Sequence, residues 1–122
     1  MINIVIADAQ ARVRAALRLL LEADATYHVI AETAYLEEIM PLVRSRRPDL
    51  ILLDWQLLNA DLPDDLIADL HKILHKMAVR VIALSSDPNC RDAALSAGAD
   101  AFVGKSDPPD VLLRTLQQMT VR

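Results

Sequence analysis

The sequence predicts an α/β fold in which a five-stranded parallel sheet is doubly wound, with helices on both faces. Two observations support this prediction. Short runs of aliphatic and β-branched residues alternate five times with longer segments whose apolar residues recur at helical spacing. The central run, residues 50–53, has four consecutive large aliphatic residues just before Asp54, which is typical of a strand buried on both faces. Strict alternation of this kind favours parallel strands joined by right-handed helical crossovers.

Each expected strand is a short apolar run that reaches a polar residue at or just after its end. β-Branched and aliphatic side chains dominate these runs, as they do in strands generally. The expected strands are residues 2–7, 27–33, 50–54, 79–84 and 101–103.

Helices are expected between the strands, where apolar residues recur every three or four positions. The first is expected over residues 9–25, which are rich in helix formers. Pro41 lies either in the first turn of a late-starting second helix or at a kink in a longer one. Start or stop signals of the remaining helices are Pro63, Asp87-Pro88, a left-handed cap at Gly98, and Asp107-Pro108-Pro109.

Length and composition indicate one globular domain spanning residues 1–122. Hydrophobic residues make up 53% of the chain and charged residues 25%. The formal net charge of −4 argues against direct nucleic-acid binding by this domain. Cys90 is the single cysteine, which excludes a disulfide framework and fits a reducing cytoplasm. Asn3 and Asp8 interrupt the apolar start, so we expect no signal peptide, and no apolar run is long enough to span a membrane.

Polar residues at the ends of four expected strands form the candidate site: Asp8, Asp54, Ser85 and Lys105. The carboxyl ends of parallel strands meet at one edge of the sheet, so these side chains are expected to converge. Carboxylates are hard oxygen ligands suited to Mg²⁺, while the ammonium and hydroxyl groups suit phosphate oxygens. An aspartate can also accept a phosphoryl group as an acyl phosphate. The pattern therefore indicates a site for a divalent cation and a phosphoryl group.

Four motifs give the chain a resemblance to the receiver domains of two-component response regulators, over essentially its whole length. They are Ile6-Ala7-Asp8-Ala9-Gln10, Pro48-Asp49-Leu50-Ile51-Leu52-Leu53-Asp54, Val81-Ile82-Ala83-Leu84-Ser85 and Ala97-Gly98-Ala99-Asp100-Ala101-Phe102-Val103-Gly104-Lys105. Each motif alone is weak, but the set is specific. The resemblance implies a flavodoxin-like (βα)5 fold with strand order 2-1-3-4-5.

The resemblance also implies a role for each site residue. Asp54 corresponds to the phospho-accepting aspartate, and Asp8 to the first member of an acidic pair that holds Mg²⁺ with it. Gln56 corresponds to the position whose backbone carbonyl also binds the metal. Ser85 and Lys105 correspond to the residues that contact the phosphoryl group.

The chain departs from the family pattern close to the expected metal site. Ala9 replaces the second acid of the pair, which usually supplies a metal ligand. Leu58 and Asn59 replace the usual Pro-Gly, and Ser106 stands where many members have proline. Loss of a metal-bound carboxylate should weaken Mg²⁺ binding on the order of 10–100-fold or more. The acceptor is therefore present beside a weakened metal site.

Other conspicuous side chains have a structural interpretation beside the functional one. Phe102 corresponds to the family's Tyr/Phe rotamer switch, or it packs in the core. His71 and His75 could bind a metal, but without the Glu of a zinc-protease motif a solvated helix face is the better interpretation. A helix end rich in arginine is either solvated or a partner contact; its arginines are Arg44, Arg46 and Arg47.

Two functions from different classes follow. The first is a phospho-accepting signalling domain, not an enzyme acting on other molecules, that receives phosphoryl from a histidine kinase on Asp54 and switches a face for an output domain, a downstream protein or a second copy. The second is a degenerate pseudo-receiver that binds partners without phosphorylation, favoured by Ala9. A flavodoxin-like redox protein is the weakest alternative, because no phosphate-binding loop rich in Gly, Ser or Thr follows the first strand and the chain has 2 glycines.

Overall fold

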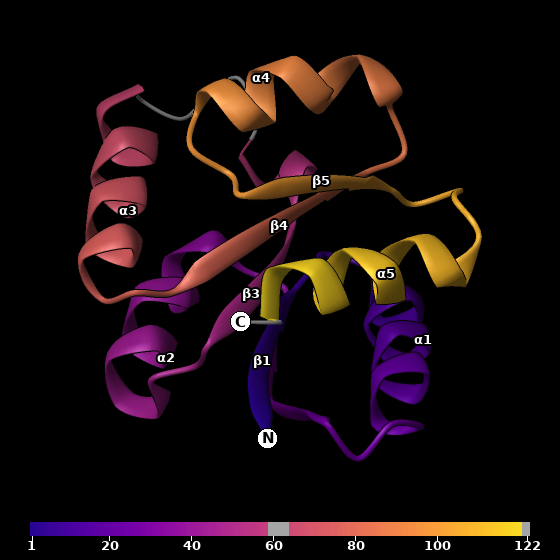
Figure 1. The fold of residues 1–122 in the computed structure, drawn as a ribbon. Coiled ribbons are helices and arrows are strands. Elements are labelled where there is room, and N and C mark those ends of the chain that lie inside the picture. The colour runs from indigo at the N-terminus through magenta and orange to yellow at the C-terminus, as the bar shows by residue number, and fades with distance from the viewer. Residues whose placement is uncertain (59–63, 121–122) are drawn as a thin grey trace.

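The computed structural model describes residues 1–58 and 64–120. Five parallel strands form one sheet in the order β2-β1-β3-β4-β5 (Figure 1). This confirms the fold class and the strand order that the resemblance implied. The strands are β1 (Ile2–Ala7), β2 (Tyr27–Thr33), β3 (Leu50–Asp54), β4 (Arg80–Ser85) and β5 (Ala101–Gly104). Three match the expected bounds; β4 is shifted one residue towards the C-terminus, and β5 is one residue longer than expected.

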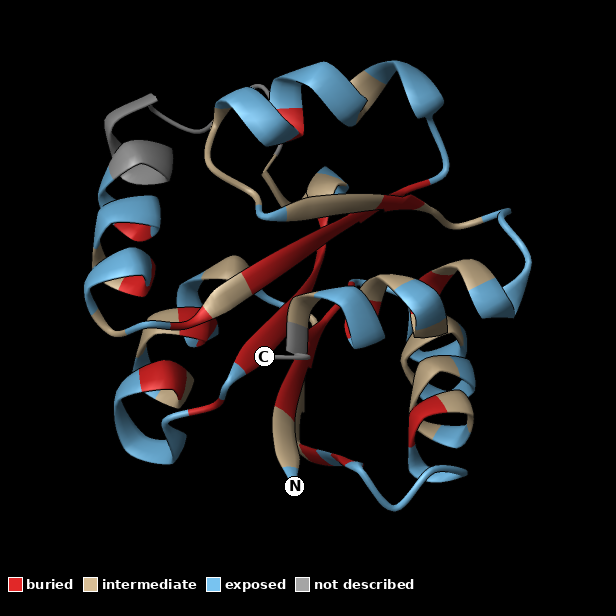
Figure 2. Ribbon diagram, viewed as in Figure 1, coloured by how far each residue is buried: buried red, intermediate tan, exposed pale blue. Residues whose placement is uncertain are grey.

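Alternation along the strands divides the core between the two faces of the sheet. In β3, Leu50 and Leu52 join one buried cluster, whereas Ile51 and Leu53 join the other. Helices α1 (Ala11–Glu22) and α5 (Pro109–Thr120) pack on the first face, and α2 (Ile39–Arg46) and α3 (Asp64–Lys76) on the second (Figure 1). Figure 2 shows the buried strands between helices that are exposed on their outer sides. The central strand is thus buried on both faces, as the unbroken aliphatic run predicts.

The expected first helix, residues 9–25, was too long at both ends. Gln10 is extended, with φ −95° and ψ 116°, and its amide donates to Asp8 Oδ1 at 2.8 Å. The helix therefore starts at Ala11. At the other end, Asp24 Oδ1 accepts a hydrogen bond from the Thr26 amide at 2.9 Å, which forms a turn into β2. Aspartate commonly replaces helical hydrogen bonds with local turns of this kind.

The second helix starts late, which settles the position of Pro41. A short 3₁₀ helix, η1 (Leu36–Glu38), precedes α2, and Pro41 is the third residue of α2. Proline is tolerated there because amides of the first turn have no helical acceptor. The helix ends at Arg46, and the next residue, Arg47, has a left-handed φ of 47°.

The third and fourth helices differ in detail from expectation. The predicted start at Pro63 lies outside the described residues; α3 is described from Asp64. A 3₁₀ helix, η3 (Pro88–Cys90), follows the predicted cap Asp87, and α4 (Arg91–Ser96) is correspondingly short. Gly98 has φ 112° and the Ala99 amide donates to the Ala94 carbonyl at 3.1 Å, so the left-handed cap is confirmed. No described helix is long and apolar enough to cross a membrane.

Candidate functional site

The four predicted site residues lie at the carboxyl edge of the sheet. The β1–β3 register pairs Ala7 with Leu53, so Asp8 and Asp54 come at the next step along adjacent strands. Ser85 is the last residue of β4. Lys105 directly follows β5, and its amide donates to the Ser85 carbonyl at 2.8 Å.

The Lys105 ammonium group forms ion pairs with both carboxylates of the site. Its Nζ lies 2.7 Å from Asp8 Oδ2 and 3.3 Å from Asp54 Oδ1. Asp8 and Asp54 are 0% and 2% exposed, and the lysine side chain is 16% exposed. Two buried carboxylates at one edge require a positive charge nearby, because an unpaired buried charge is strongly destabilising. The ammonium group supplies that charge within the chain.

The Asp54 carboxylate also caps the loop that follows it. Asp54 Oδ1 accepts a hydrogen bond from the Gln56 amide at 3.0 Å. This bond starts a 3₁₀ helix, η2 (Trp55–Leu57), where the sequence predicted only a loop. The bond fixes the backbone amide of Gln56, the residue whose carbonyl was the predicted metal ligand, next to the Asp54 carboxylate.

Asp8 retains one oxygen that fits a cation. Its Oδ1 accepts a hydrogen bond from the Gln10 amide at 2.8 Å, but its Oδ2 is buried and accepts no hydrogen bond from any described residue; the Lys105 contact is an ion pair without hydrogen-bonding geometry. Mg²⁺ prefers carboxylate oxygens and keeps several waters, so Asp8 and Asp54 fit it as partial ligands. Among the described residues no three acidic, histidine or cysteine side chains form a metal-binding group. Ala9 contributes no side-chain oxygen to this set.

Ser85 is buried and connects the site to the loop before α4. Its Oγ accepts a hydrogen bond from the Asp87 amide at 3.0 Å, and Asp87 Oδ1 accepts one from the Asn89 amide at 2.9 Å. The sequence signalled Asp87 as a helix start but not its contact with Ser85. Phe102 is half-buried on β5, opposite Ala83 of β4.

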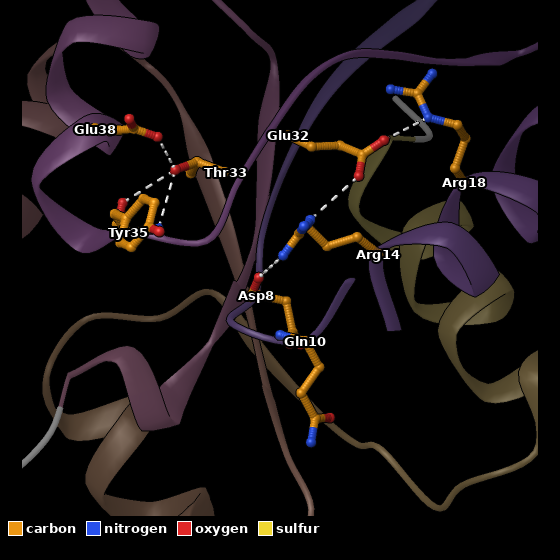
Figure 3. Close-up of polar contacts among 8 residues, drawn as sticks. All are labelled: Asp8, Gln10, Arg14, Arg18, Glu32, Thr33, Tyr35 and Glu38. Atoms are coloured by element: carbon orange, nitrogen blue, oxygen red, sulfur yellow. Dashed lines mark hydrogen bonds and ion pairs between the residues drawn. The ribbon is translucent and has the colours of Figure 1, made fainter. Parts of the chain in front are cut away.

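A polar network behind Asp8 was missed by sequence reasoning. The Asp8 amide donates to the Thr33 carbonyl at 3.0 Å, and Arg14 Nη1 donates to the Asp8 carbonyl at 2.7 Å (Figure 3). Arg14 also pairs with Glu32, whose other oxygen accepts from Arg18 Nε at 2.6 Å. The hydrogen bond that Arg18 donates to Glu32 raises the pKa of Arg18 above its ordinary value. The signal available in the sequence was a pair of arginines four apart on one helix and an acid in the next strand.

The two histidines of α3 are both exposed, with ring centroids 6.1 Å apart. His71 lies against the turn at Gly98, where an added Cβ would come within 2.2 Å of its Nδ1. No third ligand joins them within the described part of the chain. The pair agrees with a helix surface better than with a metal site.

Residues 4–117 match the sequence model of the response regulator receiver domain, so the chain belongs to this family. Comparison with curated protein sequences gives no match.

Solved structures of response regulators share the fold over nearly the whole chain. A response regulator receiver protein from Burkholderia phymatum is 28% identical, with a TM-score of 0.74 over 97% of this chain and 94% of that chain. A two-component response regulator of the LuxR family from Aurantimonas sp. is 25% identical, with a TM-score of 0.81 over 98% and 84%. A DNA-binding response regulator of the LuxR family from Staphylococcus aureus is 21% identical, with a TM-score of 0.77 over 97% and 98%.

Proposed function

We propose that this receiver domain accepts a phosphoryl group on Asp54 from a partner histidine kinase. The observation that carries the proposal is the Lys105 ammonium group, in contact with both Asp8 and Asp54 at the edge where Ser85 ends β4. Phosphoryl transfer depends chiefly on positioning and on charge stabilisation of the transferring oxygens. A lysine and a hydroxyl beside a nucleophilic carboxylate provide both.

The transfer exchanges one bond to phosphorus for another. A carboxylate oxygen of Asp54 attacks phosphorus, the bond to the donor's imidazole nitrogen breaks, and the resulting acyl phosphate stays on Asp54. Lys105 pairs with the phosphoryl oxygens. Asp8, Asp54 and the Gln56 carbonyl would hold Mg²⁺, which offsets charge on those oxygens. The chain then turns over only its own phosphoryl group, so we propose no catalysis on other molecules.

Phosphorylation would act on partners through Ser85 and β5. The Ser85 hydroxyl, which now accepts from the Asp87 amide, would donate to the phosphoryl group and alter the loop before α4. The Phe102 side chain on the neighbouring strand would change its conformation in response. Phosphorylation would thereby raise the population of a conformer whose α4, β5 and α5 face binds an output domain, a downstream protein or a second copy. The DNA-binding relative makes a DNA-binding output domain one class of partner.

A cytoplasmic location belongs to the proposal, because the kinase donor and the free cysteine fit a reducing compartment.

Acetyl phosphate tests the acceptor without the kinase. Wild type and Asp54→Asn are incubated with acetyl phosphate over a range of Mg²⁺ concentrations and weighed intact. We expect one added phosphoryl group on wild type, requiring unusually high Mg²⁺, and none on the variant. Absence of added mass on wild type at the highest Mg²⁺ would refute the proposal.

A phosphorylation-independent interaction module is the second candidate, favoured by Ala9. The missing acid leaves Lys105 as the only cation shown at the two carboxylates among the described residues. Ala9→Asp discriminates between the two functions. If the variant gains Mg²⁺ binding and phosphorylation that wild type lacks, the chain is a pseudo-receiver. Equal Mg²⁺ binding and equal phosphorylation of both proteins would contradict the argument that Ala9 weakens the site.

A further inference from the structure

We infer that Arg14 is a positioning residue for the Asp8 carboxylate and that Glu32 orients Arg14 for this role. The inference deepens the proposed function, because Asp8 is the only acid that the loop after β1 contributes to the site. The network lies behind Asp8 and contacts its backbone, as Figure 3 shows.

The contacts hold Asp8 at every polar group except the oxygen that faces the site. Its amide donates to the Thr33 carbonyl at 3.0 Å, and its carbonyl accepts from Arg14 Nη1 at 2.7 Å. Its Oδ1 accepts from the Gln10 amide at 2.8 Å. Oδ2 is left for the Lys105 ammonium group at 2.7 Å. With the backbone fixed on both sides and one carboxylate oxygen engaged, the direction of Oδ2 is determined.

Arginine suits this position because its guanidinium group presents several donors in a rigid plane. Nη1 donates to Asp8, while Nε lies 3.4 Å from Glu32 Oε1. Glu32 is itself held, since its Oε2 accepts from Arg18 Nε at 2.6 Å. The Arg14 and Glu32 side chains are 19% and 26% exposed, so solvent competes little with these contacts. Two elements, α1 and β2, therefore brace the loop that carries Asp8.

The absence of a second acid makes this bracing more important. A site with an acid at position 9 could tolerate some misdirection of Asp8, whereas here Ala9 offers no substitute oxygen. Outer partners that orient metal ligands are typically worth about 10–100-fold in metal affinity. We expect Arg14→Ala to weaken Mg²⁺ binding by a factor in this range. The phosphorylation rate at saturating Mg²⁺ should stay close to that of wild type, because Lys105 and Asp54 are untouched.

The test compares Arg14→Ala, Arg14→Lys and Glu32→Gln with Arg12→Ala. Arg12 is a matched control, an exposed arginine on the same helix without an ion pair to any described residue. The first readout is amide hydrogen exchange at Gln10 without metal, which reports the turn made by Asp8 Oδ1. The second is Mg²⁺ affinity, followed by Trp55 fluorescence. The third is phosphorylation rate against Mg²⁺ concentration.

We expect the exchange rate of the Gln10 amide to rise about tenfold in Arg14→Ala, because the loss of one hydrogen bond destabilises the turn by about that factor. The rise should be smaller in Glu32→Gln. Arg14→Lys should be intermediate, because one ammonium nitrogen cannot reach both partners in the guanidinium geometry; it also serves if the alanine variant fails to fold. Unchanged Gln10 exchange in both Arg14 variants, or an equal rise in Arg12→Ala, would overturn the inference. If wild type binds no Mg²⁺ and takes up no phosphate, the proposed function fails, while the exchange measurement still decides the role of Arg14.

Discussion

Replacement of Lys105 by Met removes the ammonium group that lies between two buried carboxylates while keeping an unbranched apolar stem. Nζ lies 2.7 Å from Asp8 Oδ2 and 3.3 Å from Asp54 Oδ1. Coulomb's law gives roughly 5 to 6 kcal/mol for each contact at an effective dielectric constant of about 20. Much of this offsets the cost of removing the charges from water, so the net loss is smaller. Removing one partner from a buried pair typically lowers the free energy of unfolding by about 3–5 kcal/mol.

Urea denaturation at neutral pH measures this loss for Lys105→Met. Arg114→Met is the control, because its ion pair with Asp110 is 66% and 68% exposed and should change the free energy by less than about 1 kcal/mol. Added MgCl2, at constant ionic strength, should stabilise Lys105→Met by about 2.7 kcal/mol at a hundred times the dissociation constant of that variant, and wild type by less at the same concentration. A stability for Lys105→Met within about 1 kcal/mol of wild type would refute the idea that the lysine holds the site together.

Three further predictions use other parts of the molecule. Ala9→Asp should raise Mg²⁺ affinity by about 10–100-fold, measured by Trp55 fluorescence titration; an unchanged affinity would show that position 9 does not reach the metal. Gly98→Ala should lower the free energy of unfolding in urea by about 1–3 kcal/mol through its φ of 112°, with a further loss from overlap with His71 that His71→Ala relieves; full stability would contradict the close approach. The hydrogen bond from the Thr26 amide lowers the pKa of Asp24. The ionised Asp24 carboxylate therefore stabilises the fold above about pH 4, and this stabilisation is lost as the pH falls through the lowered pKa. The difference in melting temperature between wild type and Asp24→Ala should shrink in acid.

The sheet and the convergence of its edge were predictable because both follow from local patterns. The run Leu50–Leu53 is aliphatic on both faces of the strand, which requires packed layers on both sides of the sheet. Each of Asp8, Asp54, Ser85 and Lys105 lies at or directly after a strand end, and parallel topology places all such ends at one edge. No knowledge of side-chain direction was needed to predict that they lie near one another.

The details that the sequence did not reveal depend on how packed elements are rotated. The Arg14 contact with Asp8 and Glu32 requires a particular rotation of α1 over β2, and an Arg on a helix gives no sign of it. The 3₁₀ turns after Asp54 and Asp87 arise because each carboxylate caps the amide two residues ahead, a competition that helical periodicity does not register. The convergence of these side chains was therefore predictable from sequence, whereas the contacts that support each side chain were not.

The most direct test of the central claim locates the phosphoryl group after reaction with acetyl phosphate at high Mg²⁺. Borohydride reduces an aspartyl phosphate to homoserine, which peptide mass mapping assigns to a position. We expect homoserine at Asp54 and at no other acid, with the yield rising with Mg²⁺ concentration. Phosphorylated protein with no conversion at Asp54, or no modification at any Mg²⁺ concentration, would contradict the assignment of Asp54 as the acceptor.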